Sequence, residues 1–309
     1  MLLSIFLVIL GIVLLFGGGE VLVDNAKKLA FSFGMSPMAV GLTVVAFATS
    51  APELAAALTA NLKGSPDLAV GNAVGSNIAN VGLILGTTAL FFTLPATTRF
   101  ISRELAFMLV VTLICYPLML SGLTIGRVEG AAMFLVLVLF IWFLLRDPDH
   151  QTDEDEADDG TPIWKSTLGV LIGVGLLVGG AQALVIGASE IARGFGISER
   201  IIGLTVIAIG TSLPELAASL VAGRKGETDI IMGNIIGSNI FNLLCILGLT
   251  ALAAPLQVAE DVMRLDYWMM LGTSLLLLVF LGLTRRLTHI EGFILLTAYV
   301  GYSVYLFMA

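Results

Sequence analysis

One long segment occurs twice in the chain. Residues 41–86 return 162 positions later as residues 203–248, and 27 of the 46 aligned positions are identical without a gap. The flanking segments do not match in this way. The similarity of the two copies therefore reflects a requirement for the particular residues that they share, and not only a general requirement for apolar residues. Any fold must accommodate two copies of this segment, so a repeat architecture is expected. The shared landmarks are Thr49/Thr211, Ser50/Ser212, Pro52/Pro214, Glu53/Glu215, Asn72/Asn234, Ser76/Ser238, Asn77/Asn239 and Asn80/Asn242.

The composition is that of an integral membrane protein. Of the 309 residues, 58% are hydrophobic and only 12% are charged. A membrane-spanning helix needs about 20 predominantly apolar residues, whereas a transmembrane barrel would show short segments of alternating polarity. We therefore expect an all-α integral membrane protein. The ten predicted spans are residues 3–23, 38–62, 68–92, 102–121, 128–146, 166–188, 200–222, 229–253, 265–284 and 290–308.

The two halves are expected to enter the membrane from opposite sides. Each half contributes five predicted spans, and an odd number of spans reverses the direction of the second copy. The halves are then inverted repeats, as in many secondary transporters, with a substrate site at their interface near the bilayer midplane. The predicted organisation is a first five-helix repeat over residues 1–146, an acidic linker over 147–164 and a second five-helix repeat over 165–309.

The net charge of −8 comes from the linker alone. Eight acidic residues and no basic residue lie between Arg146 and Lys165, and the other 15 acidic residues balance 15 basic ones. The acidic run resembles part of a calcium loop. With Asp155 first, however, positions three and twelve are Ala157 and Ser166, where such a loop needs an oxygen ligand and a glutamate. A solvated, flexible connector is the expectation.

Lysine and arginine predict the orientation in the membrane. The loops on one side carry ten basic residues and those on the other side carry five. Because cytoplasmic loops are the more basic ones, we expect a multi-pass cell-membrane protein with both termini outside and the linker in the cytoplasm. A monomer in the lipid bilayer is expected, with no nucleic-acid partner and no cofactor.

Two glutamates are the candidates for chemistry. Glu53 and Glu215 each fall in the middle of a predicted span, at matched places in the two repeats. A carboxylate at that depth costs about 2.5–3.5 kcal/mol on insertion scales and marks a functional site by default. The alternative is a pair of protonated glutamates that hydrogen-bond between helices.

Each glutamate follows a proline, in TSAPE or TSLPE. Proline removes a backbone donor, so the carbonyls around Ala48 and Gly210 lose their helical partners. Such freed carbonyls line cavities and coordinate cations in transporters. Thr49 lies four residues before Glu53, and therefore on the same helix face, as Thr211 does before Glu215.

The next span of each half supplies the pattern GNxxGSNIxN. Ser76 and Asn80 share one helix face, as do Ser238 and Asn242. One interpretation is that these side chains form hydrogen bonds between helices and do nothing else. Beside a carboxylate in the same repeat, coordination of an ion is the better interpretation.

The predicted ligand set contains only oxygen atoms. Both histidines fall outside the spans, at His150 in the linker and His289 near a loop. Calcium and sodium prefer oxygen ligands. Two ionised glutamates give a charge of about −2, which one Ca²⁺ or two to three Na⁺ can neutralise, so the two kinds of ion would compete. Competition at one alternately exposed site is the physical basis of exchange.

The paired segments GLTVVAFATSAPEL…GNAVGSNIAN and GLTVIAIGTSLPEL…GNIIGSNIFN resemble the two alpha-repeats of the cation/calcium exchanger superfamily, close to its prokaryotic sodium/calcium exchangers. The resemblance implies that the first and sixth spans slide across the other eight. It also implies that calcium binds Glu53 and Glu215 with Thr49 and Thr211, and that sodium uses the same glutamates. The further residues of the implied site are Ser50, Ser212, Ser76, Ser238, Asn80, Asn242 and the carbonyls of Ala46 and Ala208.

Some relatives in this superfamily, including potassium-dependent exchangers, carry an aspartate where this chain has Asn242. We therefore expect an antiporter that exchanges Na⁺ for Ca²⁺ by alternating access without a potassium requirement. A proton/calcium exchanger of the same superfamily is the first alternative, because glutamates can also carry protons. An ion channel or an intramembrane hydrolase is a more distant alternative. A hydrolase would need a nucleophile with its base or a metal-binding histidine, and neither is evident.

Overall fold

The computed structural model describes the chain except for residues 148–149, 151–160, 198–201, 203–205, 207 and 309. The described residues are almost entirely helical, as the apolar spans predict. The elements of the first half are α1 (Leu2–Ser32), α2 (Pro37–Val40), the π-helical turn η1 (Gly41–Val45), α3 (Ala46–Leu62), α4 (Pro66–Ala79), η2 (Asn80–Leu85), α5 (Gly86–Phe91), β1 (Leu94–Pro95), α6 (Thr98–Phe100), η3 (Ile101–Leu105), α7 (Ala106–Leu120), β2 (Thr124–Ile125) and α8 (Arg127–Arg146).

The second half repeats this order. Its elements are α9 (Ile163–Gly194), α11 (Ala208–Gly210), α12 (Leu213–Lys225), α13 (Thr228–Phe241), η6 (Asn242–Ile246), α14 (Leu247–Ala253), β3 (Leu256–Gln257), η7 (Val262–Asp266), α15 (Tyr267–Thr284), β4 (Arg286–Leu287) and α16 (His289–Met308). Several bounds, such as those of α8 and α16, differ by the same 162 residues as the sequence motifs. The structural repeat therefore extends beyond the two matching segments.

The predicted spans are largely confirmed. Within the described residues, eight helices are long and apolar enough to cross a membrane, and α16 covers the predicted tenth span. The predicted seventh span, 200–222, lies partly outside the described residues, so a count of ten is not established. The helices α1 and α9 continue well past Val23 and Ala188, where the first and sixth predicted spans end.

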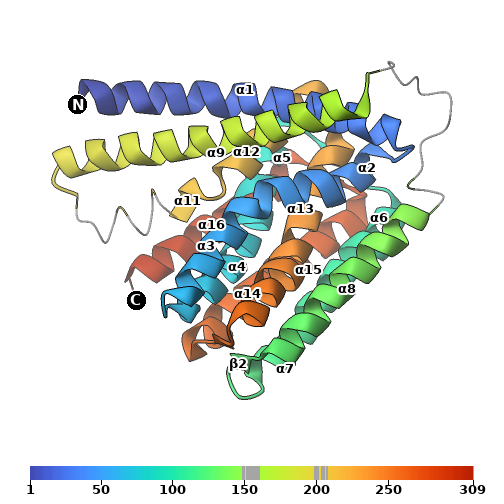
Figure 1. Ribbon diagram of the computed structural model, residues 1–309, viewed down its shortest axis with the longest axis vertical. Helices are drawn as coiled ribbons and strands as arrows, with labels where there is room; N and C mark the ends of the chain where they lie inside the picture. The colour runs from blue at the N-terminus through green and yellow to red at the C-terminus, as the bar shows by residue number, and fades with distance from the viewer. Residues whose placement is uncertain (148–149, 151–160, 198–201, 203–205, 207, 309) are drawn as a thin grey trace.

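The long helices α1 and α9 run side by side across the other helices (Figure 1). Glycines allow their backbones to approach closely. A Cβ atom at Gly11 would lie 2.7 Å from the carbonyl oxygen of Gly180, and one at Gly180 would lie 2.9 Å from that of Gly11. A Cβ atom at Gly18 would likewise lie 2.8 Å from Cβ of Leu176, whereas Gly17 and Gly179 have nothing within 4 Å of such an atom.

Two short antiparallel β pairs join the halves. β1 pairs with β4, which places Leu94 opposite Leu287, and β2 pairs with β3, which places Ile125 opposite Leu256. We call these two pairs the β clips. Each clip therefore joins a loop of one half to a loop of the other: the first joins the α5–α6 loop to the α15–α16 loop, and the second joins the α7–α8 loop to the α14–η7 loop.

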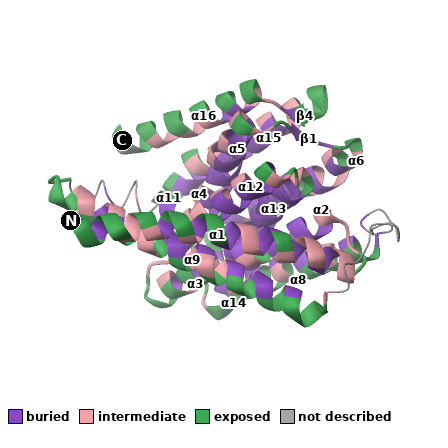
Figure 2. Ribbon diagram, turned by 90° about the horizontal axis from the view of Figure 1, so that it is seen from above, coloured by how far each residue is buried: buried purple, intermediate pink, exposed green. Residues whose placement is uncertain are grey.

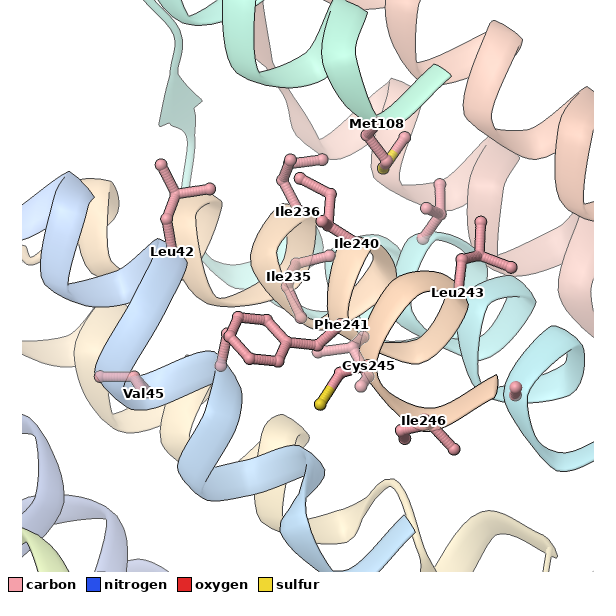
Figure 3. Close-up of a cluster of buried hydrophobic side chains, with 14 of the residues drawn as sticks. Leu42, Val45, Met108, Ile235, Ile236, Ile240, Phe241, Leu243, Cys245 and Ile246 are labelled. Atoms are coloured by element: carbon pink, nitrogen blue, oxygen red, sulfur yellow. The ribbon is translucent and has the colours of Figure 1, made fainter. Parts of the chain in front are cut away.

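The core surrounds α13. Every residue of this helix from Ile230 to Phe241 is buried, and the buried residues concentrate on α4, α12 and α13 (Figure 2). Leu42 and Val45 pack on α13 from one side and Met108 reaches toward it from α7 on another (Figure 3). The residues of the second polar motif therefore lie deep in the molecule, while α1, α8 and α16 present exposed apolar side chains at its surface.

The start of the linker departs from the expected solvated connector. Asp147 and His150 are 7% exposed. Asp147 forms ion pairs with Arg99 and Arg103, while His150 Nε2 lies 3.0 Å from an oxygen of Glu104. Charged partners on α6 and η3 hold these residues, a contact that composition does not reveal. The other linker acids, from Asp149 to Asp159, lie outside the described residues.

Candidate ion-binding site

Glu53 lies within one continuous helix. α3 runs from Ala46 to Leu62 through Pro52, and the carbonyl of Ala48 loses its ordinary helical partner because proline has no N–H. The side chain of Glu53 is buried, with 2% exposure. A carboxylate and a freed carbonyl therefore lie about one helical turn apart.

Glu215 lies instead at the beginning of a helix. α11 ends at Gly210, Thr211 and Ser212 form a turn, and α12 begins at Leu213. Pro214 in the first turn costs no hydrogen bond there. Glu215, also in the first turn of α12 and 3% exposed, lies where the positive end of the helix dipole favours a negative side chain by about 0.3–1 kcal/mol.

Hydroxyl groups accompany both glutamates. Thr49, Ser50 and Ser212 are buried, and Thr211 is half-buried in the turn. Thr49 Oγ1 lies 3.1 Å from the carbonyl oxygen of Val45 and 3.2 Å from Oδ1 of Asn234 on α13. A hydroxyl has one proton and two lone pairs, so the Thr49 oxygen retains the capacity to bind a cation.

The two carboxyl groups share one region. The carboxyl groups of Glu53 and Glu215 lie close enough for their charges to interact. Among the described residues, none of the ion pairs involves Glu53 or Glu215. In the part of the chain that the structure describes, no cationic side chain therefore pairs with either carboxyl group.

The helices of the second motif complete the region. Ser76 lies on α4 and Ser238 on α13, and both are buried. Asn80 and Asn242 begin the π-helical turns η2 and η6, a distortion that often occurs at functional sites. Since η6 packs against α3 and η2 packs against α12, each asparagine lies beside the glutamate-bearing helix of the opposite half.

The proposed backbone ligands are placed as follows. Ala46 begins α3 and its carbonyl oxygen lies 3.4 Å from Thr49 Oγ1. Ala208 begins α11, and its side chain lies outside the described part of the chain. Both alanines therefore lie one turn before their glutamate-bearing motif.

Several oxygen atoms in this region are buried without a hydrogen-bond partner. They include one carboxylate oxygen from each glutamate together with hydroxyl and amide oxygens, namely Glu53 Oε2, Glu215 Oε2, Ser50 Oγ, Ser238 Oγ and Asn242 Oδ1. A buried polar atom without a partner costs about 1–3 kcal/mol. A cluster of such oxygens fits a cation substrate, whose binding would satisfy them together.

The donor chemistry favours a hard cation. No group of three or more His, Cys, Asp or Glu side chains gathers as a metal site among the residues that the structure describes. The site residues supply two carboxylates with hydroxyl, amide and carbonyl oxygens, which suits calcium or sodium rather than a transition metal.

Three asparagines were not among the predicted ligands. Asn234 contacts Thr49, and Asn77 and Asn239 contact the predicted ligands Asn242 and Asn80. Their recurrence at the 162-residue offset was a signal that could have found them. Their role depends on contacts between the halves, which the motif alone does not reveal.

Known proteins resemble the chain over nearly its whole length. The family model described as sodium/calcium exchanger protein matches residues 3–146 and 165–308. The protein CaxA of Alkalimonas amylolytica is 42% identical over 99% of each chain. The sodium/calcium exchanger MaX1 of Methanosarcina acetivorans is 30% identical over 98% of each chain. A solved structure of the sodium-calcium exchanger NCX_Mj superposes with a TM-score of 0.85 at 26% identity, covering 97% of this chain and 98% of that one.

Proposed function

The chain belongs to the sodium/calcium exchanger family of membrane transporters, and from this membership we propose that it is a secondary active antiporter that exchanges Na⁺ for Ca²⁺. The exchange runs by alternating access and requires no potassium. If three Na⁺ move for each Ca²⁺, transport is electrogenic and is driven by both the sodium gradient and the membrane potential.

The observation that carries this proposal is the cluster of buried oxygens around two glutamates. Glu53 and Glu215 come from opposite halves, and each has a carboxylate oxygen without a hydrogen-bond partner. Their combined charge of about −2 is balanced by one Ca²⁺ or by two to three Na⁺. Two ions that need the same ligands cannot bind together, so binding of one releases the other.

The ligand roles follow from the chemistry of each group. Glu53 and Glu215 bind both ions, and Thr49 and Thr211 complete the calcium site. The sodium sites use the same glutamates with further hydroxyl and carbonyl oxygens, namely Ser50, Ser212, Ser76, Ser238, Ala46 and Ala208. Asn80 and Asn242 line the centre, and an amide rather than a carboxylate at Asn242 leaves no extra charge for potassium.

Alternating access is assigned to α1 and α9. These helices lie side by side across the others (Figure 1). The β clips join loops of the two halves among the remaining elements. Sliding of this pair over the fixed body would open the site to one side and then the other. We place both termini outside the cell membrane and the linker in the cytoplasm, because the more basic loops belong inside, and we propose that the transporter acts as a monomer.

A proton/calcium exchanger is the second candidate. The specific observation in its favour is that, among the described residues, the charged groups of the site are carboxyl groups, which can bind protons as well as sodium. The relatives named sodium/calcium exchangers favour sodium as the coupling ion.

The deciding experiment measures ⁴⁵Ca²⁺ uptake into proteoliposomes loaded with Na⁺, with K⁺ or choline as controls. We expect uptake only with internal Na⁺, without a requirement for K⁺ and without a change in internal pH. A parallel sample with an inside-acid pH gradient tests the second candidate. Uptake driven only by that gradient would replace sodium with protons, and unitary currents without counter-transport would indicate a channel.

A further inference from the structure

Two asparagine pairs cross between the halves at the centre of the molecule. Asn80 Nδ2 donates to Oδ1 of Asn239 at 2.9 Å, and Asn242 Nδ2 donates to Oδ1 of Asn77 at 2.9 Å. All four side chains are at most 2% exposed. The 162-residue offset exchanges one pair for the other, so each half holds an amide of the opposite half by the same bond.

These bonds fix which end of each amide faces the ion site. A primary amide has a donating NH₂ group on one side and an accepting oxygen on the other. With the NH₂ group of Asn242 bound to Asn77, its oxygen points away from that contact, and this oxygen is buried without a partner. Cations bind amide oxygens and are repelled by NH₂ groups, so the orientation determines whether the side chain can serve as a ligand.

The holding residues are themselves oriented. Asn77 Nδ2 lies 3.2 Å from the carbonyl oxygen of Asn239 and 3.5 Å from the sulfur of Met270. Asn239 Nδ2 lies 3.5 Å from the sulfur of Met108, which reaches toward α13 from α7 (Figure 3). Because these NH₂ groups face acceptors, the oxygens of Asn77 and Asn239 remain directed at the amides that they hold. The two methionines also differ by 162 residues.

We propose that Asn77 and Asn239 are positioning residues, which hold the amide oxygens of Asn242 and Asn80 toward the transported cation. The proposal rests on calcium transport by this site, with either sodium or protons as the coupling ion. Each half thereby orients a ligand of the other, and apparent calcium affinity depends on a contact made across the interface.

The test is a set of double-mutant cycles on the KM for ⁴⁵Ca²⁺ uptake in proteoliposomes. Asn77→Ala is expected to raise KM about tenfold, the scale of one lost buried hydrogen bond, while changing maximal rate less than threefold. The pairing predicts that Asn77→Ala adds nothing to the KM of Asn242→Ala, whereas its coupling to Asn80→Ala is weaker because it reaches Asn80 only through the Asn239 carbonyl contact. Asn239→Ala should show the reverse pattern, because interacting pairs are non-additive and separate ones are additive.

Asn61→Ala is the matched structural control. Asn61 is a buried asparagine that also bridges the halves, donating to the carbonyl oxygens of Thr250 and Ala254 at 3.2 and 2.8 Å, away from the glutamates. This variant should lower thermal stability in detergent without changing KM. If Asn77→Ala does not fold, Asn77→Asp keeps an acceptor for Asn242 and should bind calcium at least as tightly as wild type.

The outcomes separate the two proposals. Suppose that the wild type transports calcium. The positioning role alone would then be overturned if the KM effects of the single variants multiplied equally in every double variant. It would also be overturned if Asn77→Asp were as impaired as Asn242→Ala. Absence of calcium uptake by the wild type under both a sodium and a proton gradient would overturn the proposed function, and the positioning role with it.

Discussion

The helix that carries Glu53 and the helix that carries Glu215 have almost the same sequence and different backbones. α3 is continuous through its TSAPE motif, whereas the TSLPE motif contains a turn between α11 and α12. Glu53 is therefore an interior helix residue, and Glu215 belongs to a first turn. The motif evidently accepts both conformations, because proline removes the bond that would distinguish them.

The difference teaches that sequence symmetry does not impose structural symmetry in inverted repeats. In transporters of this architecture, the two access states arise as one repeat moves relative to the other. A motif that is stable both as a continuous and as a broken helix can change form at small cost. The two glutamate-bearing segments thus carry the same functional side chains but have different backbone conformations.

The largest expected effect on calcium uptake tests whether the two glutamates have the same chemical role. Glu53→Gln and Glu215→Gln should each reduce calcium uptake at least about 100-fold, because loss of one partner from a buried charge cluster costs about 3–5 kcal/mol. Uptake of ⁴⁵Ca²⁺ at matched protein content measures both. Glu260→Gln, at an exposed ion pair with Arg264, is the control. A variant that kept more than a tenth of wild-type uptake would assign that glutamate to the scaffold and break the equivalence.

The next largest effect tests the difference in backbone conformation between the two glutamate-bearing segments. A Cβ atom at Gly210 would lie 2.2 Å from Cγ2 of Val185 on α9, whereas its counterpart in the first half is already Ala48. Overpacking costs about 1–3 kcal/mol, so Gly210→Ala should lower the rate of calcium uptake about tenfold. Ala48→Gly should change it less than about threefold, because glycine within a helix costs about 0.5–1 kcal/mol.

The double variant Gly210→Ala/Val185→Ala is the check on the mechanism. Removal of the valine methyl groups makes room for the new side chain and should restore most of the uptake rate. If the double variant stays as slow as Gly210→Ala, contact with α9 is not the reason for glycine at this position.

A smaller effect concerns the contact between α1 and α12. Glu20 and Asp24 on α1 form ion pairs with Arg224 and Lys225 on α12, while the positions 162 residues after the two acids are Gln182 and Ile186. Exposed ion pairs contribute about 0.2–1 kcal/mol each. The double variant Glu20→Gln/Asp24→Asn should therefore lower the free energy of unfolding by about 0.5–2 kcal/mol.

Thermal denaturation in detergent at low and high salt measures this contribution. High salt should reduce the difference from wild type, because exposed charges are screened. Glu190→Gln, which breaks an exposed pair with Arg193 within α9, should have the smaller effect. An equal loss from both variants would mean that the contact between α1 and α12 adds nothing.

The smallest effect concerns Asp147. Burial raises the pKa of this carboxyl, but the hydrogen bonds and charges of Arg103 and Arg99 outweigh burial, so its pKa lies below the ordinary value. The stabilisation is therefore fully present above the unfolded pKa of about 3.9 and is lost as pH falls through the folded pKa. The second half has Leu265 at the position that matches Arg103.

Asp147→Asn should lower stability by about 1 kcal/mol at pH 7. The difference from wild type should shrink below about pH 4, as thermal denaturation of both proteins over a pH series would reveal. A difference that stayed constant down to pH 3 would show that packing, rather than charge, holds Asp147.

Much of the fold follows from the sequence because membrane helices need long apolar runs, and the repeat supplies their arrangement. Helix ends follow less well, since α1 continues as a helix through Glu20 and Asp24, where apolar counting stops. The two glutamates were predicted as site residues because a charge within a membrane span is costly, and the structure shows that both are buried. The turn at Thr211 is absent from the matching motif of the first half, so the motif alone does not predict it. The contacts between the asparagine pairs depend on packing between residues more than 150 positions apart, which no local pattern encodes.

The β clips carry a consequence for the origin of the chain. β1 and β3 differ by 162 residues, as do β2 and β4, so the two-fold axis that relates the halves maps one clip onto the other. A gene encoding a single half would supply both partners of the contact, and two oppositely inserted copies could meet as an isologous dimer. Fusion through a linker converts that encounter into an intramolecular step at an effective concentration near the millimolar range. After such a fusion the two halves could change independently. Gly210 and the ion pairs of Asp147 are examples, because each is present in one half and absent from the matching position of the other.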